Sequence, residues 1–147
     1  MAQYTVLLVE DDPRTRDRLA AAISANADLY LLKAAANHAE ARAALQLQTP
    51  DVLLLDLGLP DGDGTDLIPD ALRAGARVIV MSVFNNGARL NAALAAGAHG
   101  CLFKDISSGG LGRAVNALFA KSPIHVTTND PARGVMASRN LIQGRSS

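Results

Sequence analysis

The 147-residue sequence has little of what marks secreted, thiolate-metal or nucleic-acid-binding proteins. Its single cysteine, Cys101, excludes an internal disulfide and any zinc site built from several cysteines. Lys plus Arg and Asp plus Glu number 14 each, so no excess positive charge is available to neutralise nucleic-acid phosphates. Aromatic residues make up only 3% of the chain, so aliphatic side chains must fill the core.

Long apolar runs are also absent. No stretch approaches the roughly 20 apolar residues that span a bilayer. The first residues, MAQYTVLLVEDD, lack the basic and apolar segments of a secretory leader. We therefore expect a soluble, cytoplasmic protein without membrane contact, and a length that suits one domain.

Short apolar runs alternate with alanine-rich segments of helical periodicity. The runs predicted as strands are Tyr4–Val9, Leu29–Leu32, Asp51–Asp56, Arg77–Met81 and Gly100–Phe103. Helices are expected at about 13–23, 37–48, 67–72, 86–96 and 111–121, with glycines weakening the start of the last one. Five βα units in series predict an α/β fold, a doubly wound five-stranded parallel sheet with right-handed crossovers.

Polar residues stand where four of these strands end. They are Glu10, Asp11 and Asp12 after the first strand, Asp56 on the third, Ser82 after the fourth and Lys104 after the fifth. Ligands of doubly wound sheets bind beyond the carboxyl ends of the strands. We therefore expect all of these side chains to gather at one edge of the sheet.

This set of side chains suits phosphoryl transfer. Clustered carboxylates repel one another unless a cation joins them, and oxygen ligands without His or Cys favour Mg²⁺. An aspartate can act as a nucleophile and form an aspartyl-phosphate. The transferred group spreads charge over three oxygens, which a cation and a hydroxyl can stabilise. Each residue alone is more often a cap or turn former, so the interpretation rests on the combination of Asp56, Ser82 and Lys104.

The segments VLLVEDD, PDVLLLDLGLPDGDG, VIVMSVF and GAHGCLFKD resemble the receiver domain of two-component response regulators, from about Tyr4 to Lys121. The loop after the third strand and the pair Lys104-Asp105 are similar to the NarL/LuxR-type branch, which usually carries a C-terminal helix-turn-helix domain. The resemblance implies a flavodoxin-like (βα)5 fold.

The same resemblance assigns roles to the residues of the predicted site. Asp56 would be the phosphoacceptor, Ser82 the switch hydroxyl and Lys104 the partner of the phosphoryl group. The implied Mg²⁺ ligands are Glu10, Asp11, Asp56 and the backbone carbonyl of Gly58. The implied donor is a phospho-histidine on a sensor histidine kinase or a histidine phosphotransfer protein. The implied dimer surface is the fourth helix, fifth strand and last helix.

The organisation of the chain follows from its length. Residues 1–121 are predicted as the receiver domain and 122–147 as a short tail with at most one helix, near 132–143. Three further helices cannot fit, so direct DNA binding by this chain is not expected. The tail is interpreted either as a docking or dimer segment or as a loosely ordered end. The alternative reading is a receiver fragment or truncated form of a helix-turn-helix transcription regulator.

Four positions depart from the family pattern. Cys101 stands where an aromatic residue usually turns inward on activation, and we interpret it as a small buried hydrophobe. Asp105 replaces the usual proline, and a cis bond before a non-proline residue costs about 3 kcal/mol, so the cis geometry is not carried over. Gly58 and Phe84 offer no side chain to orient a hydrolytic water, which predicts slow self-dephosphorylation.

Two other functions conflict with the sequence. An aspartate-nucleophile phosphatase needs a second acid two residues after the nucleophile, where this chain has Gly58. We therefore expect no enzymatic turnover beyond self-catalysed phosphorylation and dephosphorylation. A calcium loop counted from Asp61 would need glycine at its sixth position and glutamate at its twelfth, but these are Asp66 and Leu72.

Overall fold

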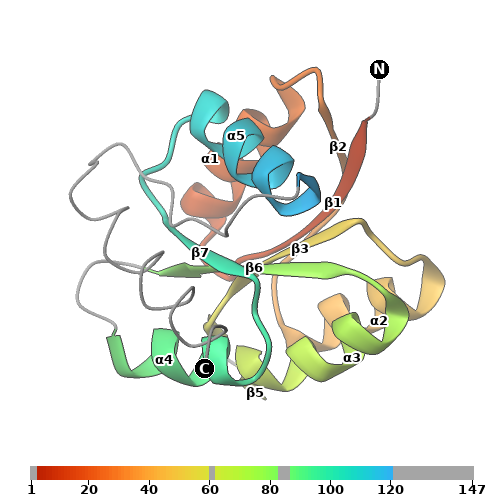
Figure 1. Ribbon diagram of the computed structural model, residues 1–147, viewed down its shortest axis with the longest axis vertical. Coiled ribbons are helices and arrows are strands. Elements are labelled where there is room, and N and C mark those ends of the chain that lie inside the picture. The colour runs from red at the N-terminus through yellow and green to blue at the C-terminus, as the bar shows by residue number, and fades with distance from the viewer. Residues whose placement is uncertain (1–2, 60–61, 83–86, 121–147) are drawn as a thin grey trace.

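The computed structural model describes residues 3–59, 62–82 and 87–120 (Figure 1). In this part of the chain, five parallel strands form one sheet in the order β2-β1-β3-β6-β7. The strands are β1 Tyr4–Val9, β2 Leu29–Ala35, β3 Val52–Asp56, β6 Arg77–Ser82 and β7 Gly100–Phe103. The helices are α1 Pro13–Ser24, α2 His38–Leu47, α3 Leu67–Ala74, α4 Gly87–Ala95 and α5 Ser108–Phe119. The predicted doubly wound parallel sheet is confirmed.

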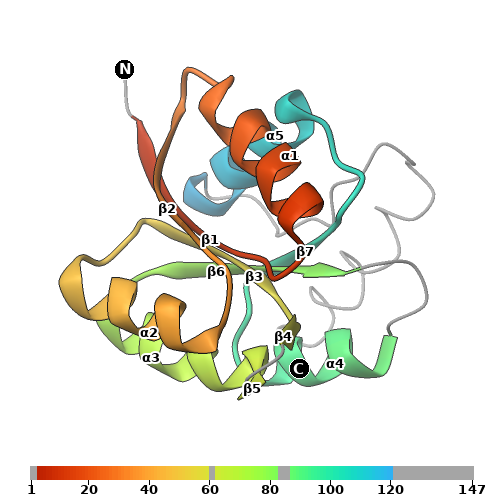
Figure 2. The same ribbon diagram turned by 180° about the vertical axis from the view of Figure 1, so that it is seen from behind.

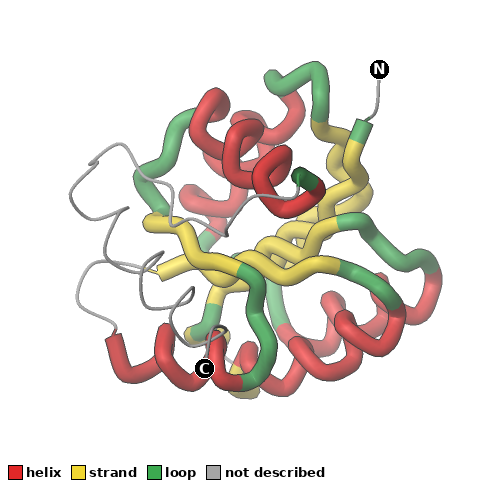
Figure 3. The backbone as a smooth tube through the Cα atoms, viewed as in Figure 1, coloured by secondary structure: helices red, strands yellow, loops and turns green. Residues whose placement is uncertain are grey.

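Helices cover both faces of the sheet. Helices α1 and α5 lie on one face, and α2, α3 and α4 lie on the other, as Figure 1 and the tube in Figure 3 show. Proline begins α1 at Pro13, and Pro69 falls in the first turn of α3, where a missing backbone N–H costs no helical hydrogen bond. No helix among the described residues is long and apolar enough to cross a membrane.

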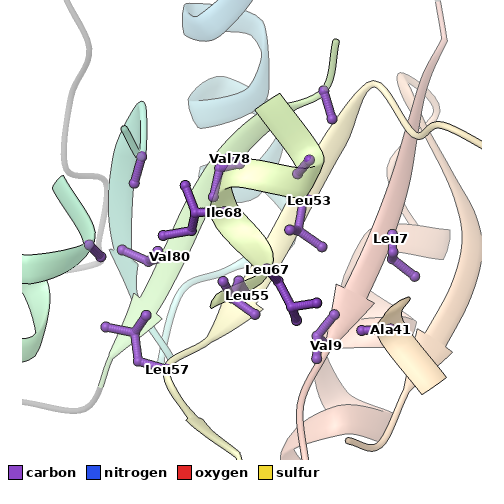
Figure 4. Close-up of a cluster of buried hydrophobic side chains, with 14 of the residues drawn as sticks. Leu7, Val9, Ala41, Leu53, Leu55, Leu57, Leu67, Ile68, Val78 and Val80 are labelled. Carbon is purple, nitrogen blue, oxygen red and sulfur yellow. The ribbon is translucent and has the colours of Figure 1, made fainter. Parts of the chain in front are cut away.

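Strand β3 is buried on both faces, and this fixes the position of Asp56 at its end. Leu53 and Leu55 point to the side of α2, α3 and α4, whereas Leu54 points to the side of α1 and α5. Figure 4 shows the first of these clusters, in which β3 and β6 pack against α3 through Leu53, Leu55, Val78, Val80, Leu67 and Ile68. An aliphatic core of this kind is what the low aromatic content predicts.

The loop after β3 contains structure that the sequence analysis did not predict. Strands β4 Gly58–Leu59 and β5 Gly62–Asp63 form a short antiparallel pair, followed by the 3-10 helix η1 Gly64–Asp66. A Cβ atom at Gly64 would lie 2.6 Å from the carbonyl oxygen of Asp56, so only glycine allows the chain to return this closely to β3. This return folds the loop back against the end of the central strand.

Two predicted boundaries were wrong. Strand β2 continues past Leu32, because Lys33, Ala34 and Ala35 pair with the last three residues of β1, and pairing outweighs the low β propensity of alanine. Helix α5 begins at Ser108, where the prediction set its start at Leu111.

The glycines near the start of α5 do not delay the helix, contrary to the prediction. The Ser107 side chain caps it by accepting a hydrogen bond from the Gly110 N–H at 3.0 Å. A Cβ atom at Gly110 would lie 2.7 Å from Ile106, and one at Gly112 would collide with the Asn26 amide. These glycines therefore allow α5 to pack closely on its neighbours. Asn86, Phe84, Lys121 and the tail at 122–147 lie outside the described residues.

Candidate functional site

The carboxyl edge of the sheet brings the predicted residues together. Asp56 is the last residue of β3 and lies in register with Met81 of β6, so Ser82 is one residue further along the neighbouring strand. Ser82 is itself paired with Phe103 of β7, and its carbonyl accepts the Lys104 N–H at 3.1 Å. Backbone pairing across the three adjacent strands β3, β6 and β7 thus places Asp56, Ser82 and Lys104 at one edge of the sheet.

Lys104 connects the two buried carboxylates of the site. Its Nζ lies 2.8 Å from Oε1 of Glu10 and 3.2 Å from Oδ1 of Asp56. The Glu10 side chain has no exposed surface, and the Lys104 side chain is only 19% exposed. Buried charges of this kind persist only when they are paired, because removing them from water is costly. The lysine therefore holds the site together by charge.

The pKa values of the three groups follow from this arrangement. Burial raises the pKa of Glu10 to about 7, although Lys104 acts against it. Burial also acts to raise the pKa of Asp56, but a hydrogen bond with Asp11 and the charge of Lys104 outweigh it and hold the pKa below its ordinary value. Burial acts to lower the pKa of Lys104, yet the two carboxylates raise it. The balance of these effects favours the charged form of the Asp56 carboxyl.

The acidic residues lie close enough together to hold a metal ion. One carboxylate oxygen from each of Glu10, Asp11 and Asp56 lies within 4.8 Å of the others. Oε1 of Glu10 is buried beside the Lys104 charge but receives no hydrogen bond of good geometry. Oxygen-only ligands with spare lone pairs fit Mg²⁺, which takes one or two carboxylates and keeps positions for water or phosphate oxygens.

Gly58 lies beside Asp56, as predicted. Its N–H donates a hydrogen bond to Oδ1 of Asp56 at 3.2 Å, which orients the carboxylate. The backbone carbonyl of Gly58 as a metal ligand stays a prediction.

Helix α1 holds the acidic loop through contacts that the sequence analysis missed. Nη1 of Arg16 donates to the carbonyl oxygens of Glu10 and Asp11 at 3.1 and 3.2 Å. Asp12 caps α1 by accepting the Thr15 N–H at 2.9 Å, and its own N–H donates to Oε2 of Glu10 at 3.1 Å. The four-residue spacing between Asp12 and Arg16 is the signal that could have placed the arginine beside the loop.

The departures from the family pattern lie close to the site. Cys101 is buried in the cluster between the sheet and α2, α3 and α4, and burial raises the pKa of its thiol to about 12. Its interpretation as a small buried hydrophobe is confirmed. The described residues contain no cis peptide bond, so the bond between Lys104 and Asp105 is trans.

Comparison with known proteins identifies the domain. A family model described as response regulator receiver domain matches residues 6–116. The DNA-binding transcriptional activator DevR/DosR of Mycobacterium tuberculosis is 35% identical over 112 residues, which are 75% of this chain and 52% of that protein. The nitrate/nitrite response regulator protein NarL of Escherichia coli is 32% identical over 115 residues, or 76% of this chain and 53% of that protein.

A solved structure agrees with these relatives. The signal receiver domain of the putative response regulator NarL from Mycobacterium tuberculosis superposes with a TM-score of 0.72 and 28% identity, covering 80% of this chain and 97% of that one. The chain spans about half the length of the two curated relatives. The motifs, the fold and the matched family model agree, and the chain belongs to the family of response regulator receiver domains.

Proposed function

We propose that this receiver accepts a phosphoryl group on Asp56 and signals by a change of conformation that alters its contacts with other proteins. The observation that carries the proposal is the Asp56 carboxylate itself. Its pKa lies below the ordinary value, it ends the buried strand β3, and Nζ of Lys104 lies 3.2 Å from its Oδ1. Together with the oxygens of Glu10 and Asp11 beside it, this carboxylate could hold the cation that phosphoryl transfer requires.

In the proposed step, a carboxylate oxygen of Asp56 forms a bond to phosphorus while the N–P bond of a phospho-histidine breaks. The imidazole leaves with the electrons of that bond. Mg²⁺ bound by Glu10, Asp11, Asp56 and the Gly58 carbonyl would supply positive charge to the oxygens of the transferred group. Lys104 then pairs with the phosphoryl group, and the Ser82 hydroxyl donates a hydrogen bond to it. The added charge, close to two negative units, drives the rearrangement.

The test uses a small phosphodonor. The protein is incubated with acetyl phosphate and Mg²⁺, and its intact mass is measured for a gain of about 80 Da, the mass of one phosphoryl group. Asp56→Asn should abolish the gain, while Asp17→Asn, which removes an exposed acid of α1, should leave it unchanged. A gain that persists in Asp56→Asn would refute the assignment of the acceptor.

The partners follow from the same proposal. We expect a sensor histidine kinase or a histidine phosphotransfer protein as donor, a cytoplasmic location, and a homodimer formed through α4, β7 and α5. The proposed receiver unit is 1–121, with 122–147 as its tail. Light scattering of the phosphorylated and unmodified protein tests the dimer, and phosphorylation without any change in association would indicate a different partner protein.

A second candidate is a receiver that belongs to a transcription regulator. The matched relatives favour it, because one is described as a DNA-binding transcriptional activator and this chain spans about half its length. Because the DNA contact would then belong to a helix-turn-helix domain outside this chain, the test is a fusion of this chain to such a domain. A higher affinity of the fusion for duplex DNA on phosphorylation would favour that reading over signalling by protein contact alone.

A further inference from the structure

At position 58, a side chain of helix α4 fills the place that a side chain of this residue would take. Figures 1 and 2 both place α4 beside the β4–β5 hairpin. A Cβ atom at Gly58 would lie 3.0 Å from Nη1 of Arg89, which is in the first turn of α4. The guanidinium of Arg89 therefore occupies the space that a side chain two residues after Asp56 would fill.

From this contact we propose that Arg89 is a second phosphoryl-binding cation of the site, an inference that rests on the proposed function. Gly58 lies against both Asp56 and Arg89. Its N–H donates to Oδ1 of Asp56, and its lack of a side chain makes room for the Arg89 guanidinium. A phosphoryl group on Asp56 would carry oxygen atoms beyond the carboxylate, and the guanidinium of Arg89 lies on the other side of Gly58, where no side chain separates the two. Arg89 binds these oxygens there.

The charges of the site support this role. Lys104 is already paired with Glu10 and Asp56, so its charge is shared before any phosphoryl group arrives. Arg89 takes part in none of the ion pairs of the described residues, and it is exposed. Arginine presents a planar fork of N–H donors that matches phosphate oxygens. It is therefore available for the added negative charge in a way that Lys104 is not.

The first test measures the rate of phosphorylation by acetyl phosphate with Mg²⁺, followed by intact mass. Arg89→Gln should lower the apparent second-order rate constant by about threefold to tenfold, as expected for one partly exposed charged contact. Arg89→Lys should recover part of the rate. Arg73→Gln removes the same charge near the far end of α3 and serves as the matched control, with an unchanged rate.

The second test uses Gly58→Ala, whose Cβ would push the end of the Arg89 side chain away. If Arg89 acts through this space, Gly58→Ala and Arg89→Gln each slow the reaction, and the double variant is no slower than the slower single variant. Two results would overturn the role of Arg89 while leaving the proposed function intact. One is an equal phosphorylation rate for Arg89→Gln and wild type, and the other is a rate loss in the double variant that equals the combined losses of the two single variants. Absence of any Asp56 adduct in the wild type would instead refute the proposed function, and this proposal with it.

Discussion

The buried carboxyl of Glu10 should make the metal-free domain less stable as the pH rises through neutrality. Its pKa is 4.5 in an ordinary setting and about 7 in the folded chain, so the folded state holds more protons than the unfolded state between these values. Stability must then fall as pH rises across that interval. The difference corresponds to about 3 kcal/mol of unfolding free energy, most of it lost between pH 5 and pH 7.

The assay is urea unfolding followed by circular dichroism, in EDTA, at several pH values from 5 to 8. Glu10→Gln removes the titrating group and keeps the shape, so its unfolding free energy should vary less with pH than that of the wild type. Both proteins contain the same histidines, so any contribution of these residues to the pH dependence of the unfolding free energy cancels in the comparison. Asp56 and Asp12 do not interfere, because their pKa values are lowered and their contributions change only below about pH 4. Parallel pH profiles for wild type and Glu10→Gln would refute the reasoning.

Three further predictions concern the acidic loop, the α1–α5 contact and the lifetime of the phosphoryl group. Arg16→Met should weaken Mg²⁺ binding, measured by calorimetry, about threefold to tenfold, because two charged hydrogen bonds to the loop are lost; unchanged affinity would show that the loop holds its shape alone. Gly112→Ala should cost about 1–3 kcal/mol in urea unfolding, because its Cβ collides with Asn26, and a neutral result would contradict that contact. The phosphorylated protein should lose its added mass over minutes or longer, since Gly58 has no side chain to orient a hydrolytic water and the guanidinium of Arg89 offers N–H donors but no acceptor for a proton of that water; a half-life of seconds would contradict this.

The position of the predicted site follows from a general property of parallel sheets, which is why sequence could reveal it. Four of the five strand runs end at a polar residue, and parallel strands deliver their carboxyl ends to one edge. Glu10, Asp11, Asp56, Ser82 and Lys104 could therefore be grouped before any coordinates were known. Their grouping depends on topology alone and needs no knowledge of side-chain packing.

Other features depend on contacts between distant segments and could not be predicted in this way. The end of β2 is set by its pairing with β1, and residues Lys33–Ala35 carry no strand signal of their own. The glycines of α5 look like helix breakers until Asn26 is found against Gly112. Arg89 reaches Gly58 only because α4 lies beside the β4–β5 hairpin, a placement that no local pattern encodes.

The close packing of α5 on α1 gives the domain one stiff side. Besides the contact at Gly112, the Ser108 hydroxyl donates to the Ala22 carbonyl at 2.6 Å, and the Asn26 amide donates to the Ser108 carbonyl at 3.2 Å. Among the described residues, α4 makes no side-chain hydrogen bond of this kind to another helix, and Ala93 is its only buried residue. If the proposed phosphorylation shifts α4 and leaves the α1–α5 layer in place, a partner that contacts only this layer would bind both forms equally well, and a partner that contacts α4 would distinguish them.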